Sequence, residues 1–211
     1  LNRVEKLQAE LLVPNGIRGK NFRSTLKNLT PRIFTKCEEL NLKTMEKNGN
    51  KIGIGVIGLG GMGKRWAEVA QNHERSVILA TTDANQDKAR QFATEFNCSY
   101  YDDWHKLLED SSINAVVIAT PHIFLTEIAQ AALLKGKHVF SEKPGGVSSK
   151  ELYKGIEIAH RNKVRYRVNF QIRSHPAVKE AKNKFSQGLI GKLMFIRGIY
   201  AHAGREGYEK E

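Results

Sequence analysis

The sequence has few of the features that mark secreted, membrane or metal-binding proteins. It contains only two cysteines, Cys37 and Cys98, which lie far apart and match neither a disulfide framework nor a metal-ligand spacing. No apolar run approaches the roughly 20 residues that span a bilayer, and the polar N-terminus lacks a secretory hydrophobic segment. We therefore expect a cytoplasmic protein with idle thiols, no metal site and no membrane partner.

The histidines and the basic residues also form no pattern that indicates a metal or nucleic-acid site. The seven histidines show no metal-ligand spacing, and only His122 is expected to lie where a ligand can reach it. The formal net charge is +12, yet the basic residues are scattered, with the densest cluster at Arg161, Lys163, Arg165 and Arg167. We interpret these charges as solvated surface and expect no nucleic-acid partner. A basic nucleic-acid-binding protein stays as an alternative, which a steep salt dependence of DNA binding would support.

The most informative segment is KIGIGVIGLGGMG at 51–63. An apolar strand is predicted at 52–57, and Gly58, Gly60 and Gly63 follow at G-x-G-x-x-G spacing and open a helix. In such a turn the first glycine permits the tight bend, the second lets the backbone approach a pyrophosphate, and the third lets helix and strand pack closely. The phosphate site is predicted to comprise Gly58, Gly60, Gly61, Met62 and Gly63. The inward face of the helix is predicted to comprise Met62, Trp66, Val69 and Ala70.

An acidic residue follows at the distance that this motif requires. Asp83 comes twenty residues after the last glycine, behind a second apolar run at 77–80, and its carboxylate can accept hydrogen bonds from both hydroxyls of an adenosine ribose. It would also repel the 2′-phosphate of NADP, and the residues at 84–86 offer no guanidinium to receive one. The sequence therefore favours NAD over NADP. A glycine-rich turn that binds nothing is the alternative, which the strand, the helix and the acid together disfavour.

From Lys51 onward predicted strands alternate with predicted helices, which indicates an α/β fold: a Rossmann-type, doubly wound parallel sheet with right-handed crossovers. The strands are expected at 52–57, 77–82, 99–101, 114–119, 137–141 and 164–169. Asp102 or Asp103 can cap one helix, while Ser148 and Glu151 form a capping box before a helix at 149–162.

Three parts are predicted along the chain. Residues 1–50 form an N-terminal extension of unknown role, with helix-like pieces broken by proline and glycine, and 51–170 form the NAD(P)-binding domain. Residues 171–211 are expected to begin a second α/β domain with a mixed sheet, with a helix from Pro176 to about Gln187 and a strand at 193–200. We expect the 211-residue chain to bind NAD but not to catalyse alone. We also expect it to self-associate through the unpaired edge of that strand.

Two further motifs follow strands, ATPH at 119–122 and SEKP at 141–144. Together with VIGLGGMG, VVIATPH, GKHVFSEKP and the stretch from Gln171 and Arg173 to Pro176, they resemble the Gfo/Idh/MocA family of glucose–fructose oxidoreductase and inositol dehydrogenase, across about 51–211. The resemblance implies an oxidoreductase of carbohydrate metabolism, a dehydrogenase that transfers hydride between NAD and a ring carbon of a sugar, inositol or nucleotide sugar. It also implies a homo-oligomer for the full-length protein.

The resemblance assigns roles to individual residues. Thr120 and Pro121 would lie along the nicotinamide half of the cofactor. For His122, its place after a strand, not the resemblance, favours a contact with the ligand. Glu142 and Lys143 would lie beside the nicotinamide ribose and the substrate, and Lys143 is the candidate for the group that takes the hydroxyl proton. Gln171 is assigned to the cofactor and Arg173 to the substrate.

The chain also departs from the pattern of the family. Leu125 replaces the histidine of T-P-x-x-x-H, Gln171 replaces an asparagine, and the downstream segment of the family that supplies a catalytic histidine does not occur among the 211 residues. A Glu-Lys-Pro turn can also be an ordinary solvated loop. A cofactor-binding sensor or assembly subunit without turnover is the main alternative function.

Overall fold

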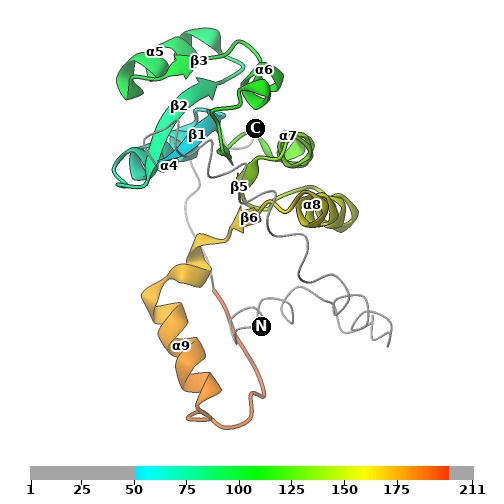
Figure 1. Cartoon of the computed structure of the whole chain (residues 1–211). Coiled ribbons are helices and arrows are strands. Elements are labelled where there is room, and N and C mark those ends of the chain that lie inside the picture. The colour runs from blue at the N-terminus through cyan, green and yellow to red at the C-terminus, as the bar shows by residue number, and fades with distance from the viewer. Residues whose placement is uncertain (1–50, 200–211) are drawn as a thin grey trace. The chain divides into compact units, whose positions relative to one another are not determined.

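The computed structural model describes residues 51–199. The N-terminal extension and the end of the predicted second domain lie outside these residues. The described chain forms a sheet of six parallel strands in the order β3-β2-β1-β4-β5-β6 (Figure 1). The strands are β1 (Ile52–Ile57), β2 (Ser76–Thr82), β3 (Ser99–Tyr100), β4 (Ala115–Ile118), β5 (His138–Glu142) and β6 (Tyr166–Asn169). The Rossmann-type fold predicted from the alternating pattern is confirmed.

Helices connect the strands and cover both faces of the sheet. They are α4 (Gly61–Gln71), α5 (Gln86–Phe96), α6 (Trp104–Glu109), α7 (His122–Leu134) and α8 (Ser149–Asn162), followed after β6 by η1 (Gln171–Ser174) and α9 (Pro176–Ser186). Since parallel crossovers are right-handed, the connections from β1 outward in the two directions place their helices on opposite faces. The strand order therefore reverses beside β1, and the glycine turn lies at that switch point.

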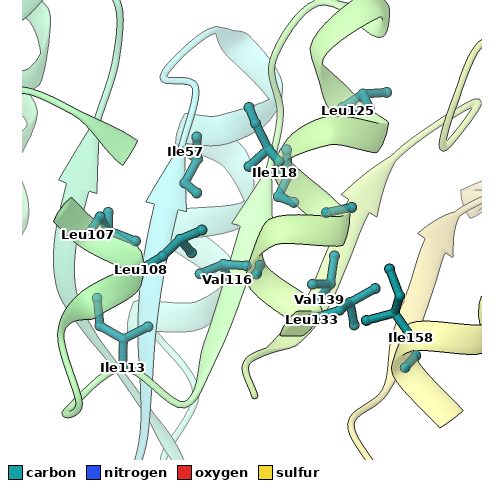
Figure 2. Packing of buried hydrophobic residues seen from close by; sticks show 14 of the residues in the cluster. Ile57, Leu107, Leu108, Ile113, Val116, Ile118, Leu125, Leu133, Val139 and Ile158 are labelled. Carbon is teal, nitrogen blue, oxygen red and sulfur yellow. The ribbon is translucent and has the colours of Figure 1, made fainter. Parts of the chain in front are cut away.

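Two hydrophobic clusters hold these layers together. The larger lies between the sheet and α6, α7 and α8, and Figure 2 shows Leu107, Leu133 and Ile158 of the helices facing Ile118 and Val139 of the strands. The smaller packs α4 and α5 on the other face through Ala67, Phe92 and Phe96, with the two phenylalanine rings stacked. The two clusters cover opposite faces, as in a parallel sheet buried on both sides.

Local signals in the sequence fix the ends of several helices. The Ser148 hydroxyl accepts a hydrogen bond from the Glu151 amide at the start of α8, and Asp103 caps α6 through the His105 amide. Gly188 has φ 76° just beyond α9. The predicted caps and the predicted start of the helix at Pro176 are confirmed.

Two sequence-based expectations are wrong. Val69 was expected to face inward, but it is 54% exposed. The buried positions of α4 are Gly63 and Ala67, one turn apart, whereas Val69 lines an apolar pocket beside Trp66 and Ala70, where its side chain remains open to solvent. The strand expected at 193–200 is also wrong over its described residues, because 193–199 form no strand. A strand needs a neighbour to pair with, and no described segment pairs with this one.

Candidate functional site

Four neighbouring strands end at the predicted site residues. In the order of the sheet these are Asp83 after β2, Gly58 after β1, Thr120 beyond β4 and Lys143 after β5. Because the strands are parallel, all four residues lie along one edge, and three strand spacings separate the outer two by about 14 Å. Ligands of open α/β sheets bind at this edge, beside the switch point.

The glycine turn has the geometry that the motif predicts. Gly58 has φ 87°, and a side chain there would meet the backbone of Ala119 and Thr120 at 2.7–2.9 Å. A β-carbon on Gly63 would overlap the carbonyl oxygen of Gly58, so the third glycine is required for α4 to pack on the turn. Gly60 has nothing within 4 Å of its would-be β-carbon. The backbone there is open to a ligand at the N-terminus of α4, where unpaired N–H groups attract anions.

The rest of the turn begins the helix. Gly60 is the N-cap of α4 and provides no side-chain cap, so its neighbours keep their amides available. Gly61 is the first helical residue and is exposed, while Met62 is half-buried. The cofactor roles predicted for these two residues stay predictions.

Asp83 is joined to the glycine turn. Its Oδ2 accepts a hydrogen bond from the Leu59 amide at 2.7 Å, and its Oδ1 accepts one from the Asn85 amide at 2.9 Å. Each carboxylate oxygen retains a further lone pair. The acid is thus held at the turn with acceptor capacity left for ribose hydroxyls, as the predicted NAD site requires.

The end of β4 provides a polar atom that lacks a partner. Thr120 Oγ1 is buried and has no hydrogen-bond partner among the residues that the structure describes. Pro121 caps α7 and His122 is its first residue; both are exposed. Leu125, in the place of the family's histidine, is fully buried in the larger cluster and faces the core.

Lys143 and Glu142 have opposite environments. Lys143 is exposed at the end of β5 and precedes a cis peptide bond to Pro144. Glu142 is only 7% exposed, and its carboxylate accepts hydrogen bonds from the Trp66 indole, the Asn169 amide and the Lys143 backbone. The carboxylate of Glu142 is therefore committed to the protein's own donors, and its predicted contact with the cofactor stays a prediction.

Gln171 and Arg173 lie in η1, directly after β6, and both are exposed. The Arg173 guanidinium lies over the Phe170 ring at 4.7 Å from its centre. Their predicted cofactor and substrate roles stay predictions. The sequence reasoning missed the roles of Trp66 and Asn169. One signal was available, since a glutamate at the end of a buried strand must find hydrogen-bond donors.

The sequence also predicted idle thiols and neither a metal site nor a membrane partner. Between residues 51 and 199 no group of histidine, cysteine and acidic side chains could hold a metal ion. Burial raises the pKa of the Cys98 thiol to about 11, which leaves it unreactive at neutral pH. In the same residues no helix is both long and apolar enough to cross a bilayer.

These features define a dinucleotide-binding domain: a glycine turn at the switch point, an acid after the second strand and a buried hydroxyl at the end of β4. Comparison with known sequences gives the family. The model of the oxidoreductase family with an NAD-binding Rossmann fold, Gfo/Idh/MocA, matches residues 52–170, more than half of the chain. The chain belongs to this family, and the resemblance inferred from its motifs is confirmed.

Several relatives of known name are similar to the chain. Levoglucosan dehydrogenase of Pseudarthrobacter phenanthrenivorans is 32% identical over 164 residues, which cover 71% of this chain and 40% of the relative. The NAD-dependent scyllo-inositol 2-dehydrogenase of Bacillus subtilis is 29% identical, over 74% of this chain and 46% of the relative. The crystal structure of scyllo-inositol dehydrogenase from Lactobacillus casei with bound NAD(H) and scyllo-inositol is 27% identical, with a TM-score of 0.63 over 67% of this chain and 42% of that one. The chain therefore spans less than half the length of these relatives.

Proposed function

We propose that this chain is the NAD-binding part of a dehydrogenase that acts on a ring carbon of a sugar, inositol or nucleotide sugar. One observation carries the proposal: Asp83, the glycine turn, Thr120 and Lys143 follow one another along a single edge of the sheet. The family and the names of the relatives support the redox chemistry and the substrate class.

The residues present fit NAD. The open backbone at Gly60 would face the pyrophosphate, Asp83 would accept from the adenosine ribose, and the unpartnered Thr120 hydroxyl would lie toward the nicotinamide half. Asp83 also disfavours NADP, because its charge would repel a 2′-phosphate. Bound NAD supplies the hydride acceptor for the oxidation of a secondary alcohol.

We assign the transfer of the substrate hydroxyl proton to Lys143. When the substrate carbon loses hydride, its hydroxyl must lose a proton, and the exposed Lys143 amine at the end of β5 can take it in its neutral form. In the reverse direction the ammonium form returns the proton to the carbonyl oxygen. Arg173 is expected to bind substrate hydroxyls as a donor from the turn that follows β6.

Lys143→Met tests this assignment. We expect turnover to fall by roughly two to four powers of ten, the range for loss of one acid or base, while the Kd for NAD changes by less than about threefold. Binding is measured by calorimetry with the 211-residue chain, and turnover with a sugar and inositol panel in any longer protein that the gene encodes. Lys150→Met, an exposed lysine on α8, is the matched control. Near-normal turnover of Lys143→Met would leave Lys143 as a turn residue.

The main alternative is a sensor or assembly subunit that binds NAD without turnover. It predicts NAD affinity that depends on Asp83, together with no hydride transfer to any member of the panel. Absence of NAD binding altogether would contradict both readings of the site.

A further inference from the structure

The carboxylate of Glu142 is the meeting point of three elements. Its Oε1 accepts from Trp66 Nε1 of α4 at 2.8 Å and from Asn169 Nδ2 of β6 at 2.7 Å, while its Oε2 lies 3.3 Å from the amide nitrogen of Lys143. Glu142 and Asn169 are both nearly fully buried, so the bond between them is shielded from water, while the bonds from Trp66 and Lys143 are partly buried. A buried carboxylate that lost one of these donors would be left with an unsatisfied acceptor, which would destabilise the local structure.

The placement of Trp66 follows from the periodicities of helix and strand. Phe140 and Glu142 are two residues apart on β5 and so point to the same face of the sheet, the face that α4 covers. Trp66 contacts both of them: its ring meets the Phe140 ring edge-on at 4.9 Å, and its N–H reaches the Glu142 carboxylate. The indole is held at two points and cannot donate its hydrogen bond from another position without losing the aromatic contact.

The turn that follows Glu142 is also held at its far end. Gly145 has φ 88°, and its carbonyl oxygen accepts a hydrogen bond from the Tyr166 hydroxyl at 2.9 Å. The exposed Lys143 lies between these two anchors, so its position depends on the backbone that carries it. Glu142 anchors the near end of this turn to the same helix that begins at the glycine turn.

We infer that Trp66 and Asn169 are positioning residues, which act through Glu142 to fix the turn that carries Lys143 relative to the NAD site. The inference rests on the proposed function for the role of Lys143. The reason for such a brace is geometric: a displacement of about 1 Å at a catalytic group can reduce a rate about a hundredfold.

The first test needs no activity. In the 211-residue chain, Trp66→Phe keeps an aromatic ring beside Phe140 and removes the indole N–H donor. Asn169→Ala removes the second donor. We expect amide hydrogen exchange at 143–147 to become at least about tenfold faster in each variant, with exchange in β4 unchanged. Trp104→Phe is the matched control, because Trp104 is the other tryptophan of the chain and belongs to α6. Unchanged exchange at 143–147 in both variants would overturn the inference.

The second test separates positioning from general damage. Where the longer protein turns over, Trp66→Phe should lower kcat about ten- to a hundredfold while the Kd for NAD stays within about twofold. In the Lys143→Met background the same substitution should lower kcat less than twofold, because its effect passes through Lys143. Equal losses in both backgrounds, or a loss of NAD affinity as large as the loss of kcat, would contradict the inference. Absence of turnover in the unsubstituted protein would instead contradict the proposed function, and the exchange result would still decide whether the brace exists.

Discussion

At the scale of single residues, the candidate site depends on side chains whose neighbours already restrain them. Asp83 has no freedom to turn away from the glycine loop, since the Leu59 and Asn85 amides hold both of its oxygens. Thr120 shows the opposite condition, a buried hydroxyl oxygen that finds no hydrogen-bond partner within residues 51–199. A fixed acceptor and an unpaired hydroxyl along one edge are the features that a bound ligand would complete.

The first prediction concerns cofactor choice. Replacing Asp83 with Ser removes ribose hydrogen bonds and the charge that repels a 2′-phosphate, so we expect the ratio of NAD to NADP affinity to fall about ten- to a hundredfold. Calorimetric titration of both cofactors measures it. Asp87→Ser removes the same charge from an exposed position on α5 and should leave the ratio unchanged. An unaltered preference in the Asp83 variant would remove this residue from the site.

At the scale of elements, the glycine turn separates a folding requirement from a binding requirement. Gly58 has both a positive φ and backbone atoms in the way of a side chain, whereas Gly60 has an ordinary extended conformation with φ −65° and open space beside it. The motif assigns the tight bend to the first glycine and the approach of the pyrophosphate to the second. Their surroundings show that only the first is needed for the chain to fold.

The second prediction follows from this difference. Gly60→Ala should leave the Tm within about 2 °C, because nothing lies near the new methyl group, and yet weaken NAD binding at least about tenfold by blocking the approach of a pyrophosphate. Gly58→Ala should lower the Tm by several degrees through strain and contact with Ala119. Thermal melts and NAD titrations of both variants check this. Full NAD affinity in Gly60→Ala would show that the ligand does not approach this backbone.

The third prediction concerns how the free energy of unfolding depends on pH through His138. Burial, followed by the nearby Arg165 charge, lowers the pKa of His138 at the start of β5, and its Nδ1 accepts a hydrogen bond from the Arg165 amide. The unfolded chain therefore takes up this proton first, near pH 6.5, and the free energy of unfolding should decrease as pH falls below that value. In His138→Asn, whose side-chain oxygen can still accept from Arg165, urea melts at pH 7.5 and 5.5 should differ less. An equal pH dependence in both proteins would assign it to other groups.

Much of the sheet could be predicted from the sequence, because β-branched runs, glycine spacing and helix caps are local signals. The six strands, the position of Asp83 and the start of α9 all follow from such signals. The brace on Glu142 could not be predicted in this way, since its donors are 76 and 27 residues distant and meet only through the strand order. The strand expected at 193–200 failed for a related reason: apolar β-branched residues show that a strand is possible, but pairing depends on a neighbour elsewhere.

At the scale of the whole molecule, the described chain has two regions of different character. Residues 51–169 bury two apolar clusters, whereas α9 has no buried residue. The segment after α9 exposes large apolar side chains, among them Met194 at 81%, Phe195 at 79% and Ile196 at 73%. Large exposed apolar side chains in this number favour association with another surface.

The fourth prediction is that the 211-residue chain self-associates through this segment. Sedimentation velocity at increasing concentration should show oligomers at tens of micromolar, and the double change Phe195→Lys and Ile196→Lys should return the chain toward monomer. Leu134→Lys, an isolated exposed leucine at the end of α7, is the control and should leave association unchanged. Association that persists in the double variant would place the contact elsewhere.

The bond between the Leu59 amide and Asp83 has a kinetic consequence. It ties the tip of the glycine turn to the second strand before any dinucleotide arrives, so the ligand meets a preorganised surface and does not have to order a loop. Association should then be limited by encounter and orientation and be independent of any slower conformational step. Differences in affinity among variants of the turn would consequently be differences in how long the dinucleotide stays bound.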